Sequence, residues 1–213
     1  MQIETSKTLG GVGAILMFLG VIPFISYYGI IELVGLILVM VSLYNLASYY
    51  TEKGIFNNAL YGLITGIVGG VIAAGTLILL VLSSLTDFLY TVYPDWNGDW
   101  SALSGLTPDV SNIDVSAVMP FITGFFATLL ILWIFAIIAF YFVRRSLTTL
   151  SAKTGVGLFA TAGLLMLIGA VLLVAMLIGA LLIWIGLLLL AAAFFQIKPQ
   201  QTQPVPPPAP PPM

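Results

Sequence analysis

The chain of 213 residues has no cysteine and no histidine, and it has few charged residues of either sign. Without these two residue types it forms no disulfide and lacks the usual ligands of zinc, copper and iron–sulfur clusters. Histidine is also the most common general base and the centre of most catalytic triads. We therefore expect no cofactor, no bound metal and no enzymatic activity.

The scarcity of charge excludes a soluble protein. Charged residues make up 7% of the chain and hydrophobic residues 61%, and the mean hydropathy is +1.16. An ordinary soluble domain has about a quarter of its residues charged, so this chain could not cover its surface in water. Several apolar runs exceed the roughly 18 to 20 residues that span a bilayer. The composition predicts a polytopic integral membrane protein.

The apolar runs predict an all-α fold, a polytopic bundle of six transmembrane helices. We expect the spans at about 9–25, 30–50, 59–85, 119–143, 155–175 and 178–197. Residues 155–197 carry no charge, and as one helix they would be about 60 Å long, twice the hydrocarbon thickness of a bilayer. The chain therefore has to turn back within this stretch, and we expect the turn near 174–179.

Polar segments flank this transmembrane domain, which we place at residues 9–197. They are a short N-terminal segment, 1–8, an external loop, 86–117, and a proline-rich tail, 198–213. The loop contains every aspartate of the chain and no basic residue: Asp87, Asp95, Asp99, Asp109 and Asp114. The composition of the tail is typical of an extended or disordered segment.

The basic residues orient the chain in the membrane. They are Lys7, Lys53, Arg144, Arg145, Lys153 and Lys198. With six spans they all fall on one side, in short loops and at the termini, and the aspartates fall on the other. Short loops rich in lysine and arginine stay cytoplasmic. We therefore expect both termini in the cytoplasm and a multi-pass protein of the cell membrane, with these six residues as topology anchors.

Four residues of the second span form a candidate intramembrane polar site: Glu32, Ser42, Asn45 and Ser48. Glu32 lies near the outer end of the span. There it is either a carboxylate stabilised by the helix dipole and headgroup water, or a proton or cation site. The other three recur at every third residue and form one stripe. This stripe either makes hydrogen bonds between helices or lines a path for water.

Small residues recur at every fourth position of the third span: Gly62, Gly66, Gly70 and Ala74. This pattern allows another helix to approach closely. We expect it to pack against a helix of the same chain or of a neighbouring one.

Three junctions between polar and apolar sequence resemble those of a known family. They are 5–13 (TSKTLGGVG), 55–59 (IFNNA) and 153–159 (KTGVGLF). They are similar to an archaeal membrane protein family defined only as a domain of unknown function, number 996. The resemblance covers about residues 5–197. It implies a multi-span protein of unassigned activity and transfers no catalytic residue.

Weak similarity between the first and last hairpins suggests an internal repeat. Residues 6–8 resemble 152–154, and 16–20 (LMFLG) resemble 165–169 (LMLIG). Both hairpins run in the same direction, so the repeat would be a parallel one. Helices rich in leucine and glycine also match by chance, and this alternative stays open.

Two functional hypotheses follow from the sequence. The first is a structural or accessory membrane protein that acts through helix packing with partner proteins or lipids. The alternative is a small channel or transporter that uses the polar stripe of the second span. An intramembrane enzyme is the least favoured class. The expected partners are the lipid bilayer and either further copies of the chain or another subunit of a membrane complex, with no nucleic acid.

Overall fold

The structure is a computed structural model that describes residues 3–21, 29–109 and 115–198, with side chains described from residue 119 onward in the last range. This part of the chain forms six α-helices and two 3-10 helices and contains no β-strand, so the fold is all-α. The elements are α1 (Ile3–Gly20), α2 (Ile30–Tyr49), α3 (Lys53–Val92), η1 (Trp100–Gly105), α4 (Val115–Thr154), α5 (Leu158–Val171), η2 (Leu172–Ala175) and α6 (Leu177–Phe195).

The six helices form a closed ring in sequence order. Each helix packs against the next one along the chain, and α6 packs against α1. Within the described residues, pairs across the ring make hardly any contact. Helices α3 and α4 form the most extensive pair, and the packing of α2 on α3 is the sparsest in the ring. The ring is therefore least closely packed between α2 and α3.

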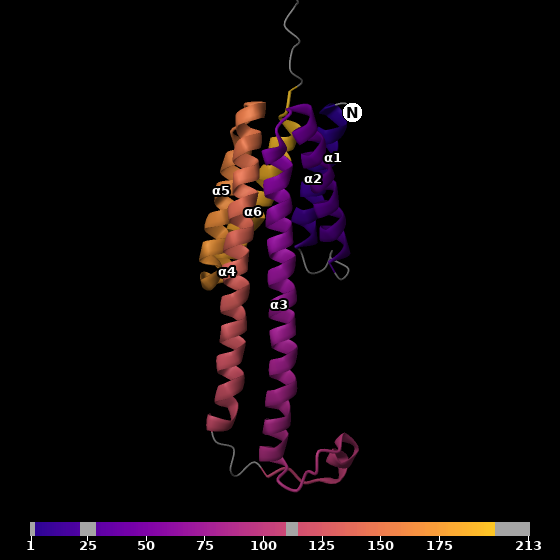
Figure 1. Ribbon diagram of the computed structural model, residues 1–213, viewed down its shortest axis with the longest axis vertical. Coiled ribbons are helices and arrows are strands. Elements are labelled where there is room, and N and C mark those ends of the chain that lie inside the picture. Colours follow the sequence, from indigo (N-terminus) through magenta and orange to yellow (C-terminus); the bar gives the residue numbers. More distant parts are fainter. Residues whose placement is uncertain (1–2, 22–28, 110–114, 199–213) are drawn as a thin grey trace, which may run out of the picture.

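Helices α3 and α4 are twice as long as their neighbours. Each has 40 residues, which corresponds to about 60 Å, whereas α1, α2, α5 and α6 have 14 to 20 residues each. Figure 1 shows the α1–α2 and α5–α6 hairpins beside one half of the long pair, and the other half extending beyond them as a separate two-helix arm. The arm ends in the connection that contains η1.

Two tryptophans donate hydrogen bonds to backbone carbonyls at the ends of the short helices α1 and α5. The indole Nε1 of Trp184 donates a hydrogen bond to the carbonyl of Phe18, near the end of α1, at 2.9 Å. The Nε1 of Trp133 donates to the carbonyls of Ala170 and Val171, at the end of α5. The last carbonyls of a helix have no partner within the helix, and hydrocarbon offers none. Each indole therefore satisfies a backbone group at the hairpin end that lies away from the termini.

The packed core lies at the end of the ring where both ends of the described chain meet. The large side chains that are completely or almost completely buried gather there: Leu46, Ile55, Leu147, Leu150, Phe159, Phe194 and Ile197. Two of them, Phe159 and Phe194, form an edge-to-face ring pair with centroids 5.1 Å apart. At the same end, Gly155 adopts a left-handed conformation (φ +72°) and ends α4, as glycine does at many helix C-termini.

The helix boundaries differ from the predicted spans. The segment from Arg144 to Lys153, predicted as a loop, is helical and forms the last turns of α4. Helix α3 begins at Lys53 and ends at Val92, so it extends beyond both ends of the predicted span 59–85. The connection between α3 and α4 is correspondingly shorter than the predicted loop 86–117. The turn between α5 and α6 lies at Met176, within the predicted range.

Five helices, α2 to α6, are long and apolar enough to cross a membrane, with α5 continued by η2. Helix α1 does not meet that standard among the described residues. Its predicted span, 9–25, continues into residues that lie outside the description, as do Asp114 and all of the tail beyond Lys198. The structure therefore supports a membrane protein with at least these five apolar helices.

Candidate functional site

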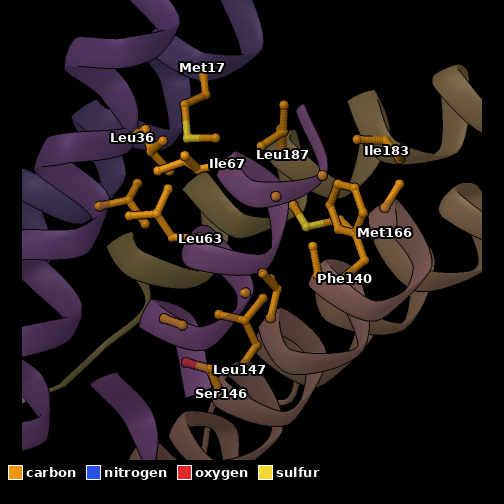
Figure 2. Close-up of a pocket in the computed structure, with 18 of the residues that line it drawn as sticks. Met17, Leu36, Leu63, Ile67, Phe140, Ser146, Leu147, Met166, Ile183 and Leu187 are labelled. Carbon is orange, nitrogen blue, oxygen red and sulfur yellow. The ribbon is translucent and has the colours of Figure 1, made fainter. Parts of the chain in front are cut away.

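A cavity of about 550 Å³ lies at the centre of the ring. All six helices contribute to its lining, for example through Met17 of α1, Leu36 of α2, Met166 of α5 and Leu187 of α6. Figure 2 shows these apolar side chains gathered around the space. Among the described residues that line it, Ser146 alone has a polar side chain.

Glycines of α3 leave room for the cavity. Gly62 and Gly69 lie close to α4. A Cβ on Gly62 would come within 2.8 Å of the Ala139 carbonyl, and a Cβ on Gly69 would clash with the Phe135 side chain. A Cβ on Gly66 would meet only the Ala139 methyl, at 4.0 Å, and a Cβ on Gly70 would meet nothing within 4 Å. Gly66 and Gly70 therefore leave the space beside them unfilled, and both line the cavity.

The packed core closes the cavity at the end of the ring where the basic residues lie, which is the basic end of the molecule. Leu147 lines the cavity and belongs to the same buried cluster as Ile55, Leu150 and Phe194. The hydroxyl of Ser146, at this end of the cavity, donates a hydrogen bond to the Ile55 carbonyl. No hydrogen-bond donor of that side chain is left for an occupant, because a serine hydroxyl has a single proton. The cavity is therefore an apolar pocket whose one polar side chain among the described residues already donates to the backbone.

The six predicted topology anchors lie towards the same end of the ring. Lys7 and Lys198 line one shallow hollow together with the α4–α5 turn. The Nζ of Lys153 lies 3.1 Å from a carboxylate oxygen of Glu52, at the residue before Lys53 and α3. Figure 1 shows the N-terminus, the start of α3 and the ends of α4 and α6 at this end. Arg144 and Arg145 are exposed on α4, about two to three turns before its end.

The predicted stripe of the second span does not share one environment. Ser42 is completely buried, and its hydroxyl donates to the Ser6 carbonyl of α1 at 2.6 Å. Ser48 is exposed and donates to the Tyr44 carbonyl of its own helix. The amide Nδ2 of Asn45 is buried, and within the described part of the chain it has no hydrogen-bond partner.

Glu32 lies near the end of α2 that faces away from the basic residues. Its side chain is partly buried and packs beside Gly20, because a Cβ on Gly20 would come within 2.5 Å of the Glu32 side chain. Glu32 is thus at the opposite end of α2 from Asn45 and Ser48, and the helix has 20 residues. The structure does not bring the four predicted polar residues together into one site.

The predicted ridge of small residues on α3 has two parts. Gly62 packs against α4, as described above, whereas Gly66, Gly70 and Ala74 are exposed to the cavity or the outside. Two other small residues, Gly69 and Ala73, are buried on α3 instead. The ridge therefore contacts α4 at Gly62, near the basic end, and borders open space at Gly66 and Gly70.

The connection between the two long helices folds back on the end of α3. Trp96 is buried, its ring contacts Tyr90 and Trp100, and its Nε1 donates to the Asp99 carbonyl. The Asp99 carboxylate accepts hydrogen bonds from the hydroxyl and the backbone N–H of Ser101. These two hydrogen bonds, the side-chain one first, lower the pKa of Asp99. The described aspartates of this connection, Asp95, Asp99 and Asp109, follow the end of α3 that lies opposite the basic residues.

Sequence reasoning missed the cavity and the two tryptophans that complete the hairpins. Trp133 and Trp184 lie in the middle of apolar runs, far from the polar junctions where membrane tryptophans usually gather. A tryptophan at such a position needs a partner for its indole N–H, and this was the available signal. For the cavity the sequence offered only the glycines, whose pattern also fits ordinary helix packing.

The fold and the cavity define an all-helical protein whose helices are apolar enough for a membrane. Residues 31–188 match the family described as "Protein of unknown function (DUF996)". Because the match covers well over half of the chain, the protein belongs to this family, as the three junction segments indicated.

A relative in an archaeon supports this assignment over nearly the full length. The uncharacterized protein MJ1644 of Methanocaldococcus jannaschii is 26% identical over 199 residues, which cover 92% of this chain and 94% of the relative. No solved structure matches the chain. The comparisons thus identify the family and an archaeal relative, and they carry no activity.

Proposed function

We propose that this is a multi-pass protein of the cell membrane, without enzymatic activity, that acts as a structural or accessory component through helix packing with lipids or partner proteins. The observation that carries the proposal is the apolar centre of the ring, closed by the packed core at its basic end. An ion or polar solute needs a continuous polar path, because hydrocarbon and apolar side chains offer it no hydrogen bonds. Ser42 and Ser146, the buried serines of α2 and α4, already bond to backbone carbonyls.

The exposed surface supports the same proposal. Apolar side chains of the arm are strongly exposed, among them Leu79 at 70% and Phe126 at 64%. Contiguous apolar surfaces of this extent mark contact with a membrane or another protein. Copies of the chain or a different subunit could cover part of this surface, and lipid covers the rest.

The orientation in this proposal has six spans and both termini in the cytoplasm. It is supported by the separation of the basic residues from the aspartates along the long axis, because short basic segments stay in the cytoplasm. The chain has no cysteine, so single cysteines report the orientation directly. In intact cells, a membrane-impermeant maleimide should label Ser104→Cys, near the acidic end, and not Thr148→Cys, near the basic end. Labelling of Thr148→Cys alone would reverse the orientation.

The functional part of the proposal is tested by gentle extraction and reconstitution. Extraction in mild detergent should give an oligomer or a protein with a reproducible partner, and liposomes containing the protein should be tight to ions. A monomer that extracts without a partner and whose liposomes pass ions would refute the accessory role.

A channel or transporter is the second candidate. It is favoured by the buried Nδ2 of Asn45, which has no hydrogen-bond partner among the residues that the structure describes. An amide in this state gains from a polar ligand, because an unmade hydrogen bond is costly in an apolar interior. If this function is correct, liposomes should pass a cation or small polar solute, and Asn45→Leu should abolish the flux. Ser48→Ala, on the exposed side of the same helix, is the matched control and should leave it unchanged.

A further inference from the structure

We propose that the central cavity binds one hydrocarbon chain of a membrane lipid, an inference that rests on the proposed function and gives it a specific lipid site. The first argument is the chemistry of the lining. A buried water needs two to four polar partners. Among the described residues of the lining only Ser146 has a polar side chain, and its hydroxyl already donates a hydrogen bond to the Ile55 carbonyl. The occupant that this lining stabilises is therefore apolar.

The second argument is the shape of the cavity. Along α4 its lining extends from Leu132 to Ser146, fourteen residues apart, which corresponds to about 21 Å. The hydrocarbon of one bilayer leaflet is roughly 15 Å deep, half of the total thickness. The volume of 550 Å³ lies within the roughly 300–1,000 Å³ of typical ligand pockets. An apolar space of this volume, lined along about 21 Å of α4, suits one extended chain.

The third argument is the position of the opening. Gly66, Ile67 and Gly70 line the cavity, each of them is exposed, and a Cβ on Gly70 would meet nothing within 4 Å. We place the opening of the cavity along α3, because the packing of α2 on α3 is the sparsest in the ring. Exposed apolar side chains flank this opening, including Ile64 and Val71. Because this surface faces hydrocarbon in a membrane, the molecules that reach the opening are lipid chains.

The glycines allow the cavity to be filled without disturbing the helix. A side chain at Gly66 or Gly70 begins in open space, since nothing but the Ala139 methyl lies within 4 Å of either Cβ position. Gly75 is the matched control. It lies in the same helix, its Cβ position also meets nothing within 4 Å, and it does not line the cavity. Gly66→Phe and Gly70→Leu should therefore exclude a chain, and Gly75→Leu should not.

The test uses photo-crosslinking in vesicles of phosphatidylcholine that contain a small fraction of a phosphatidylcholine with a diazirine in its acyl chain. In the unaltered protein, mapped crosslinks should include the inward residues Met166 and Leu187, which are almost completely buried, as well as outward residues such as Leu79. In Gly66→Phe the crosslinks at Met166 should fall at least about tenfold, which is the loss expected when the burial of about two methylenes is removed. Crosslinks at Leu79 should stay unchanged, and Gly75→Leu should behave as the unaltered protein.

Three outcomes would overturn the inference: crosslinks confined to outward residues, equal inward crosslinking in all variants, or an equal loss in the Gly75→Leu control. Circular dichroism and gel filtration show whether Gly66→Phe folds, and Gly70→Leu provides an independent variant if it does not. Ion flux measured in the same vesicles separates this inference from the proposed function. Tight vesicles without inward crosslinks reject the lipid site alone, whereas flux through the unaltered protein rejects the accessory role.

Discussion

The contact between α1 and α2 at Gly35 provides a test of the fold. Replacement of glycine by alanine should have one effect at Gly35 and the opposite effect at Gly75, an open position of α3. At Gly35 a Cβ would lie 2.5 Å from the Gly13 carbonyl oxygen and 2.8 Å from the Met17 nitrogen. Both neighbours are backbone atoms of α1 and cannot rotate away. At Gly75 a Cβ would meet nothing within 4 Å. We predict that Gly35→Ala destabilises the protein and Gly75→Ala stabilises it.

The magnitudes follow from two opposing terms. Alanine is favoured over glycine inside a helix by up to about 1 kcal/mol, and this term alone acts at Gly75. Overpacking in a close contact costs about 1–3 kcal/mol, and the backbone neighbours place Gly35 at the upper end. The net loss for Gly35→Ala is then about 2 kcal/mol, so the free energies of unfolding of the two variants should differ by about 3 kcal/mol.

The assay is unfolding of the purified protein in mixed micelles by increasing SDS, followed by far-UV circular dichroism. A further variant, Gly13→Ala with Gly35→Ala, should lose less stability than the sum of the single variants, because the two sites share one contact. If Gly35→Ala is as stable as Gly75→Ala, helices α1 and α2 do not cross at these glycines and the described packing of this hairpin is wrong.

Three further predictions concern side chains that make one or two hydrogen bonds each. Ser42→Ala removes the bond to the Ser6 carbonyl and should lower the free energy of unfolding by about 1 kcal/mol, measured by the same SDS titration. Trp133→Phe keeps an aromatic ring but leaves carbonyls at the end of α5 without their donor, so amide hydrogen exchange in 172–176 should become faster while exchange in α2 stays unchanged. The lowered pKa of Asp99 means that its contribution to the fold of the connection is present above the ordinary aspartate pKa and is lost as the pH falls through the lowered value. Tryptophan fluorescence should therefore change as the pH falls below the ordinary aspartate pKa, and Asp99→Asn should remove the part of that change that comes from Trp96.

The helical class and the separation of the basic residues from the aspartates could be predicted from the sequence, because both depend on composition along the chain. Apolar runs of sufficient length indicated the helices, and the separation of basic residues from aspartates indicated the two ends. The predicted boundaries were less accurate because a helix does not stop where its apolar run stops. The segment that starts at Arg144 stays helical since Ser146, Leu147 and Leu150 are buried in the core.

The cavity could not be predicted, for a different reason. A helix of a soluble protein shows its inner face as the apolar one, but these helices are apolar on all sides, so periodicity does not reveal which face points inward. Gly62 and Gly66 look alike in the sequence, yet the first contacts α4 and the second faces open space. Only the arrangement of all six helices in a ring distinguishes them.

The unequal lengths of the helices have a mechanical consequence for the membrane. Helix α4 continues for eighteen residues, 115–132, before it reaches Trp133 at the end of α5, which corresponds to about 27 Å. The four short helices, of 14 to 20 residues, are about 21 to 30 Å long, so they approach or match the hydrocarbon thickness of about 30 Å. The apolar length of α3 and α4 therefore exceeds the thickness that their neighbours span. Such a hydrophobic mismatch favours tilting of the long helices, local thickening of the bilayer or association of the arms of several copies.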